Sequence, residues 1–163
     1  IMRKIEIDMA HRIPLHSSQC RHVHGHRYVV EMHCTGHLQS GGPADGMVVD
    51  FGFMKELLMR HVHSPCDHGM VLSVGDDFVE HMVGAGQMDD VRERVTFAGH
   101  HGTMSMWGKL YVIKHAPTAE NLAKHWYECM KQDVATSSQG AAALTKIKVW
   151  ETPNCWAEFS DRH

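Results

Sequence analysis

The sequence predicts a single α+β domain, and three observations lead to that class. Strand-like alternation occupies both ends of the chain, segments with helical periodicity lie between them, and 163 residues is the length of one domain. The expected order is strand, strand, helix, helix, strand, strand, within one domain over residues 1–163. Residues from about 69 to 114 show no clear period overall, and we expect them to form an insertion.

Two strands are predicted in the N-terminal third. Between residues 2 and 9, Ile5 and Ile7 alternate with acidic residues, which indicates a half-buried strand. A loop then leads to residues 28–35, where apolar and polar side chains again alternate. The polar members of this second strand favour an antiparallel sheet with one solvated face.

Two helices are predicted in the middle of the chain. Asp50 is the expected cap of the first helix, which Pro65 is expected to end. The positions i, i+3, i+4, i+7 and i+8 are Met54, Leu57, Leu58, His61 and Val62, which form one stripe of the helix. Thr118 is the expected cap of the second, which should run to about Gln132.

The remaining elements are shorter. Residues 146–151 show the clearest alternation in the chain and are predicted to form a strand, and residues 155–159 form the last one. Within the insertion, residues 76–83 suggest a short helix and residues 110–113 a strand.

Composition excludes several classes of protein. A formal charge of −3 without a basic block gives no electrostatic footprint for nucleic acid or for an acidic membrane surface. No apolar run approaches the roughly 20 residues of a membrane helix, and no signal-peptide pattern is present, so we expect a cytoplasmic protein. Five cysteines without a C-x-x-C pair argue against a disulfide framework and against a zinc ribbon.

The segment from Cys20 to His26 carries the most chemistry. If the second strand extends backwards, His24 and His26 point to the same face, because strand side chains alternate. His11, at the end of the first strand, is a third candidate ligand. Three imidazoles without a fourth protein ligand match a zinc site that keeps one position open, which would leave Cys20 free to act on a substrate.

Several short motifs in this order resemble a known family. They are Ala10-His11-Arg12, Cys20-x-x-x-His24-Gly25-His26, Gly46-Met47-Val48-Val49-Asp50-Phe51, Asp67-His68, Pro117-Thr118-Ala119-Glu120-Asn121 and Glu151-Thr152. Together they resemble the 6-pyruvoyl-tetrahydropterin synthase and 6-carboxy-tetrahydropterin synthase family. The compact spacing of Cys20 and His24 is similar to the bacterial, queuosine-pathway branch.

The resemblance implies a fold and an assembly. The fold would be the tunnelling fold, an antiparallel four-stranded sheet with two helices on one face. Three chains would close into a barrel, and two such trimers would stack into a homo-hexamer whose active sites lie where subunits meet.

The resemblance also implies the roles of individual residues. It places Zn²⁺ on three ligands, makes one thiol the catalytic base with an Asp–His pair as its proton relay, and makes one carboxylate the anchor of the pterin ring. In this sequence the ligands are His11, His24 and His26, the base is Cys20, the relay is Asp67 and His68, and the anchor is Glu151. Thr118 and Glu120 are candidate substrate contacts, although helix capping also accounts for them.

The implied activity is that of a zinc-dependent lyase, 6-carboxy-5,6,7,8-tetrahydropterin synthase. It would act on 7,8-dihydroneopterin triphosphate in 7-deazapurine (queuosine-type) biosynthesis, and Arg12 or Arg27 could receive the triphosphate. The alternatives are 6-pyruvoyl-tetrahydropterin synthase activity and a non-catalytic pterin- or metal-binding protein on the same fold.

Other features of the sequence depart from the family or receive no role. The family usually continues Asp-His with Lys-Asn-Leu, whereas Gly69-Met70-Val71 follows here. Most of the remaining cysteines are expected to be buried small residues. The histidine pairs His61-x-His63 and His100-His101 are expected to be solvated.

Overall fold

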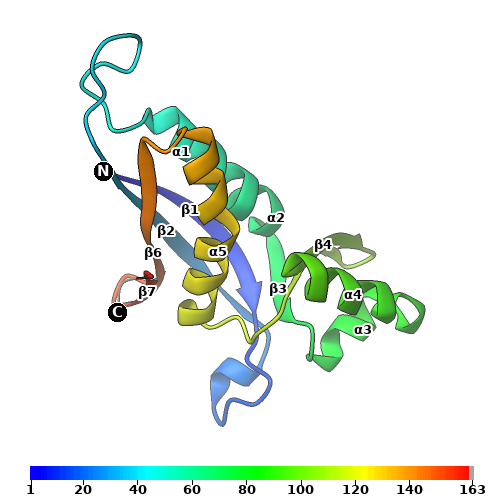
Figure 1. The fold of residues 1–163 in the computed structure, drawn as a ribbon. Helices are drawn as coiled ribbons and strands as arrows, with labels where there is room; N and C mark the ends of the chain where they lie inside the picture. The colour runs from blue at the N-terminus through cyan, green and yellow to red at the C-terminus, as the bar shows by residue number, and fades with distance from the viewer. Residues whose placement is uncertain (162–163) are drawn as a thin grey trace.

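The computed structural model of the chain describes residues 1–161, so Arg162 and His163, the end of the expected domain, lie outside the described part. Its centre is one mixed seven-stranded sheet in the order β4-β5-β3-β1-β2-β6-β7 (Figure 1). The strands are β1 (Met2–His11), β2 (His24–Gly36), β3 (Gly69–Ser73), β4 (His100–Ser105), β5 (Gly108–Ile113), β6 (Ala142–Thr152) and β7 (Cys155–Phe159). The helical segments are η1 (Gln19–Arg21), α1 (Phe51–Leu58), η2 (Met59–His63), α2 (Ser64–Cys66), α3 (Asp77–Val83), η3 (Ala85–Gln87), α4 (Met88–Ala98) and α5 (Ala119–Ser137).

The strands β1, β2, β6 and β7 form the antiparallel part of the sheet. The second strand begins at His24, as its backward extension predicted, and His11 of β1 lies opposite His24. Every second residue of β1 and β2 points towards the helices, and most of these residues are apolar. The three histidines continue the same series at one end of the two strands.

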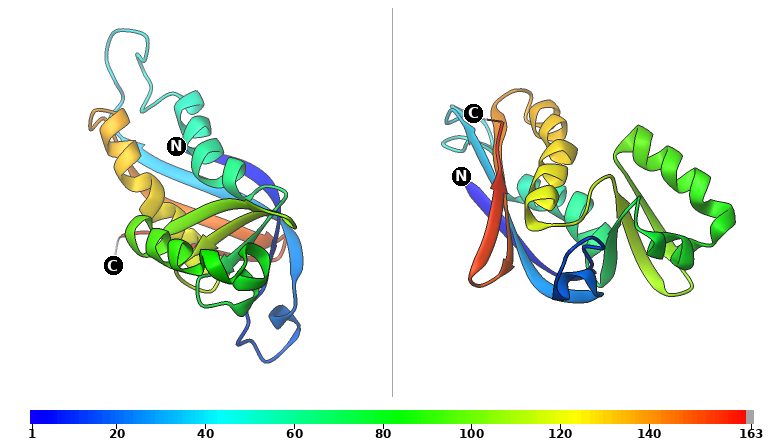
Figure 2. Two further views of the ribbon diagram at one scale, coloured as in Figure 1. Left: turned by 90° about the vertical axis from the view of Figure 1, so that its right-hand side faces the viewer. Right: turned by 90° about the horizontal axis from the view of Figure 1, so that it is seen from below.

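Two helical segments cover one face of this antiparallel part, which confirms the expected layer arrangement. The first runs without interruption through α1, η2 and α2, and the second is α5; Figure 2 shows both on the same side of the curved sheet. Trp126 and Met130 of α5 pack with Met54 and Leu58 of α1 in one buried cluster with β1, β2 and β6. No helix within residues 1–161 is long and apolar enough to cross a lipid bilayer.

The caps were predicted correctly, but both helices run further than expected. Asp50 accepts a hydrogen bond from the N–H of Gly52, and Thr118 accepts one from the N–H of Asn121. Pro65 does not end the first helix, because it follows a π-helical turn and begins a new turn, where its missing N–H costs little. The second helix continues to Ser137 instead of ending near residue 132.

The expectation of a four-stranded, purely antiparallel sheet was wrong. The insertion adds β3, β5 and β4 at the edge of β1, and the β1–β3 and β3–β5 pairs are parallel. The short helix and the strand expected within the insertion are present as α3 and β5, whereas β3, α4 and β4 were not predicted.

The insertion has its own small core, which explains why its sequence shows no clear alternation of apolar and polar residues. Tyr111 and Ile113 of β5 face the main cluster, while Leu110 and Val112 face a second cluster built by α3 and α4. Because both faces of β5 are buried, its sequence is a continuous apolar run instead of an alternating one. The insertion therefore extends the sheet.

Candidate active site

His11, His24 and His26 come together at one end of the β1–β2 pair. Each offers one ring nitrogen, and these atoms all lie within 4.8 Å of one another. Strand register produces this arrangement, because His11 lies opposite His24 and the two-residue period places His26 on the same face. The structure thus brings together the three residues that the sequence singled out as ligands.

Backbone carbonyl groups orient two of the three rings. His11 Nδ1 lies 2.8 Å from the carbonyl oxygen of Pro117, and His24 Nδ1 lies 2.7 Å from that of His22. Each Nδ1–H therefore donates to a carbonyl, which leaves the lone pair of each ring on Nε2. This is the outer contact that metal-bound histidines commonly make.

The ring of His26 shows whether a metal ion suits these three residues. His26 Nε2 is buried and has no hydrogen-bond partner among residues 1–161. Burial lowers the pKa of both His11 and His26, so both rings are neutral at pH 7. Neutral imidazoles with converging lone pairs, one of them otherwise unsatisfied, fit a Zn²⁺ ion.

Cys20 lies in the short helical turn η1 and is half-buried, and it is not part of the three-histidine group. It borders a cavity together with His11 and Glu151. The further lining residues are Ile13, His16, Thr118, Ala119, Glu120, Cys155 and Trp156. The thiol therefore faces a space that adjoins the candidate metal site, and Thr118 and Glu120 border the same space.

Glu151 approaches the histidines from β6. Its Oε1 atom lies 3.6 Å from His11 Nε2 and 3.9 Å from His26 Nε2. An irregularity in the pairing of β6 with β7, between Trp150 and Thr152, occurs at this residue. The carboxylate is about one-third exposed, so it can also reach a molecule in the cavity.

Tyr28 is a member of the site that the sequence did not single out. Its hydroxyl lies 3.1 Å from His11 Nε2 and donates to Glu151 Oε1 at 3.3 Å. Burial and the Glu151 carboxylate raise the pKa of Tyr28 far above its ordinary value, so the phenol stays protonated. The signal was available, because Tyr28 continues the two-residue period of His24 and His26.

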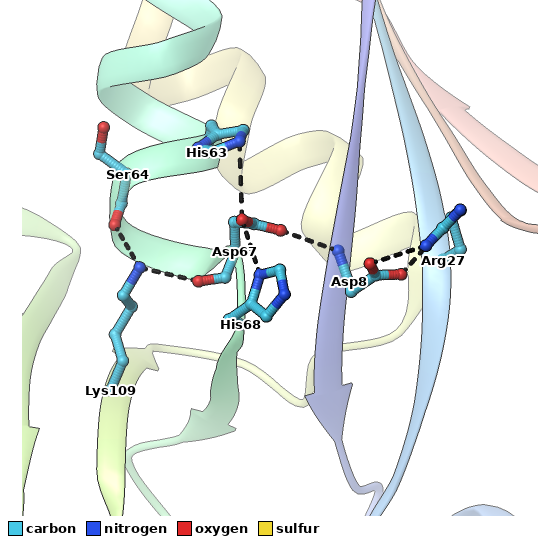
Figure 3. A network of polar contacts seen from close by, with 7 residues as sticks. All are labelled: Asp8, Arg27, His63, Ser64, Asp67, His68 and Lys109. Atoms are coloured by element: carbon cyan, nitrogen blue, oxygen red, sulfur yellow. Dashed lines mark hydrogen bonds and ion pairs between the residues drawn. The ribbon is translucent and has the colours of Figure 1, made fainter.

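Asp67 and His68 form a second polar group, at the end of α2 (Figure 3). Asp67 Oδ1 accepts a hydrogen bond from the N–H of Asp8 at 3.0 Å, and its Oδ2 lies 2.8 Å from His68 Nδ1. Burial opposes ionisation of Asp67, but the hydrogen bonds from Asp8 and His68 outweigh it and lower the pKa of this carboxyl. The carboxylate thus orients an exposed imidazole, as in a catalytic dyad.

The backbone around this pair is held by the insertion. His68 has a positive φ of 54°, an uncommon conformation for a residue with a side chain. Lys109 of β5 donates to the carbonyl oxygens of Ser64 at 2.9 Å and Asp67 at 2.7 Å (Figure 3). A Cβ atom at Gly69 would lie 3.1 Å from Lys109 Cδ, so the departure from the family's Lys at this position makes room for the Lys109 stem.

Within one chain, the Asp67–His68 pair and Cys20 border different spaces. His68 lines a cavity with Asp8, Gly25 and Arg27, and none of the described residues of that cavity also lines the cavity of Cys20. The main chain of β1 separates them, since Asp8 and His11 lie on opposite faces of the strand. A single described chain therefore does not join the predicted relay to its thiol.

The two arginines considered for the triphosphate both have carboxylate partners. Arg12 Nε lies 2.8 Å from Asp76 Oδ2 of the insertion, and Arg12 also pairs with Asp77. Arg27 Nε lies 2.9 Å from Asp8 Oδ1.

The paired histidines that were expected to be solvated are only partly exposed. His61, His63, His100 and His101 are all partly buried, because helix η2 and strand β4 pack against other elements. Of the other cysteines, Cys34 and Cys66 are buried as expected, Cys129 is partly buried and Cys155 is exposed.

The comparison with known proteins decides the family. The family profile described as 6-pyruvoyl tetrahydropterin synthase matches residues 1–162. The chain belongs to this family.

Members of the family are similar to the chain over nearly its whole length. A protein of Rickettsia bellii named 6-carboxy-5,6,7,8-tetrahydropterin synthase is 34% identical over 156 residues, covering 96% of each chain. A Haemophilus influenzae protein of the same name is 23% identical and covers 99% of this chain and 98% of its own.

Solved structures show the tunnelling fold of the family. The Caenorhabditis elegans 6-pyruvoyl tetrahydropterin synthase superposes with a TM-score of 0.62 at 20% identity, covering 99% of this chain and 94% of its own. An uncharacterized protein from Wolinella succinogenes gives a TM-score of 0.74 at 17% identity, covering 99% of this chain and 97% of its own. The tetrahydropterin synthase family and its fold, both expected from the motifs, are thus confirmed.

Proposed function

We propose that the protein is a zinc-dependent 6-carboxy-5,6,7,8-tetrahydropterin synthase, a lyase acting on 7,8-dihydroneopterin triphosphate in 7-deazapurine (queuosine-type) biosynthesis. The convergence of His11, His24 and His26 around the unpartnered Nε2 of His26 is the observation that carries the metal-dependent part. The names of the full-length relatives support the carboxy branch of the family. Its location in the cytoplasm stays a prediction of the sequence.

The three histidines would hold the zinc, which would supply Lewis-acid stabilisation of negative charge on side-chain oxygens of the substrate. The reaction requires removal of weakly acidic protons from side-chain carbons. We assign this step to Cys20, and its position at the cavity that His11 also lines supports the assignment. Because Cys20 is not one of the zinc ligands, its sulfur lone pair stays available to accept the proton.

Glu151 would fix the pterin ring. Its carboxylate is partly exposed to the cavity and can accept two hydrogen bonds from adjacent N–H groups of the ring. Tyr28 donates to the same carboxylate from the buried side and limits its movement. The side chain of the substrate would then extend towards the histidines.

Assembly would complete the proton relay. The Asp67–His68 pair is preorganised, but it borders a different cavity from that of Cys20 in the same chain. In the proposed hexamer, a dimer of trimers, the pair from one chain would serve the thiol of a neighbouring chain. Turnover should accordingly disappear when the assembly dissociates.

Product identification tests the proposal. Purified protein loaded with zinc and given 7,8-dihydroneopterin triphosphate should release acetaldehyde and triphosphate together with 6-carboxy-tetrahydropterin, identified by mass. The Cys20→Ala variant is the control, since it should bind zinc without turnover. An assembled, zinc-loaded protein that leaves the substrate unchanged would refute the enzyme assignment, and a pyruvoyl product would favour the other branch of the family.

A further inference from the structure

A second cluster of metal-binding side chains lies away from the candidate active site. It consists of His100 from β4, and His125 and Cys129 from α5. One donor atom from each of these three residues lies within 4.8 Å of the others. His125 and Cys129 are four residues apart, so they lie on the same face of the helix.

We propose that His100, His125 and Cys129 form a second metal site, which takes Zn²⁺ and joins the inserted part of the sheet to α5. Two imidazoles and one thiolate are the borderline and soft donors that zinc prefers. With ordinary zinc bond lengths, a tetrahedral site would separate sulfur and nitrogen by about 3.6 Å. Cys129 Sγ lies 3.6 Å from His125 Nε2 and 4.0 Å from His100 Nδ1, so the required movement is small.

The surroundings keep His125 in the form that can bind a metal. Burial lowers the pKa of His125 to about 3, so its ring is neutral. The hydroxyl of Tyr111, which stays protonated because burial raises its pKa, lies 2.9 Å from His125 Nε2. A donor at this position leaves the ring proton on Nδ1 and directs the Nε2 lone pair into the cluster. A bound ion would replace this hydrogen bond.

Neighbouring groups favour a cation at this place. Burial, and then the carboxylates of Glu128 and Asp133, raise the pKa of the Cys129 thiol to about 11, so a metal would have to displace the thiol proton. The same carboxylates attract a cation, and Asp133 also lies 2.8 Å from His61 Nε2. A thiolate and a divalent ion together carry one positive charge, which these carboxylates partly offset. A cavity lined by His125, Asn121 and Lys114, among others, adjoins the cluster and offers an entry path.

The site is separate from the three-histidine group in sequence and in its residues. His11, His24 and His26 come from β1 and β2, whereas the second cluster joins α5 to a strand that only the insertion supplies. A metal here would link α5 directly to β4, where the rings of His125 and His100 already lie with their centroids 5.6 Å apart. It would therefore act on stability, while the proposed chemistry belongs to the first site.

Zinc stoichiometry tests the proposal. The chain is stripped with a chelator, reloaded with Zn²⁺ and freed of excess metal by gel filtration, and the metal is then measured by mass spectrometry. We expect two zinc ions per chain in the unmodified protein, and one each in Cys129→Ser and in His24→Ala. Cys34→Ser, which changes a buried thiol in β2, is the matched control and should keep both.

Cobalt provides a readout of the ligands themselves. Co²⁺ bound by a thiolate absorbs in the near ultraviolet, and this band should persist in Cys20→Ala and His24→Ala but disappear in Cys129→Ser. Loss of the second zinc should lower the melting temperature by about 5 to 10 °C at zinc concentrations a hundredfold above Kd. Circular dichroism checks folding, and His100→Ala removes the same site through another element if Cys129→Ser does not fold.

The outcomes separate the two metal proposals. One zinc per chain that is lost from His24→Ala and kept in Cys129→Ser overturns the second site and leaves the first. One zinc per chain that is kept in His24→Ala and lost from Cys129→Ser establishes the second site and overturns the first. A cobalt band that is unchanged in Cys129→Ser also refutes thiolate ligation by this residue.

Discussion

Replacement of Asp67 by Asn tests the proposed relay with little disturbance of the fold. In the unmodified protein the backbone nitrogen of Asp8 lies 3.0 Å from Asp67 Oδ1, and the amide oxygen of Asn can accept the same hydrogen bond. The NH₂ group then takes the place of Oδ2, 2.8 Å from His68 Nδ1. Because that group donates where the carboxylate accepted, His68 must carry its proton on Nε2, the tautomer opposite to the one now favoured.

The expected effects differ strongly in size. Exchange of a charge-assisted hydrogen bond for a neutral one lowers the free energy of unfolding by about 1 kcal/mol. A general acid or base held in the wrong tautomer loses about 10²- to 10⁴-fold in kcat. Turnover should therefore fall by orders of magnitude while the melting curve hardly moves.

The assay compares kcat on 7,8-dihydroneopterin triphosphate with zinc content and oligomeric state. Asp133→Asn is the matched control, because Asp133 contacts His61 with the same 2.8 Å separation but lies outside the candidate active site. The control should keep its turnover. If Asp67→Asn retained kcat within about threefold of the unmodified protein, with metal and assembly intact, the relay would be wrong.

The remaining predictions concern the base, the anchor, pH and the insertion. Cys20→Ala should lose about 10²- to 10⁴-fold in kcat at unchanged zinc content, and retained turnover would exclude this base. Glu151→Gln should raise KM for the pterin substrate and leave the zinc content unchanged, which steady-state kinetics and metal analysis can measure. The pKa of Asp67 is lowered by folding, so its stabilising effect is complete above its ordinary value of 3.8 and is lost as the pH falls below that value; denaturant titrations should show unmodified and Asp67→Asn proteins converging in acid. Leu110→Ala in the core of the insertion should lower the free energy of unfolding by about 2–5 kcal/mol, whereas Leu15→Ala, at a side chain 99% exposed, should change it by less than about 0.5 kcal/mol.

Local features of the chain were read correctly because their causes are local. Asp50 and Thr118 cap helices through groups two or three residues away, and a side chain's position in a strand fixes the face it occupies. Pro65 misled the prediction of the helix end, since the π-helical turn before it depends on packing against the sheet.

The insertion could not be read in the same way. Strands β3 and β5 of the insertion are buried on both faces, so their apolar residues occur in continuous runs that indicate neither a face nor a partner. The parallel pairing of β3 with β1 joins segments about 60 residues apart, and nothing in either segment specifies the other. Lys109 illustrates the consequence, because it supports the Asp67–His68 turn from a strand whose place was not predictable.

The sequence by itself determined the family, because the motifs carry the family pattern. It also determined the three histidines that converge and the thiol beside them, because side chains two residues apart in a strand lie on the same face. Only the tertiary structure decided that Tyr28 holds Glu151, that the Asp67–His68 pair and Cys20 of one chain border different cavities, and that His100 meets His125 and Cys129. Those contacts join elements whose relative position follows from the burial of apolar surface over the whole domain. A burial pattern of that kind has no local signature in the chain.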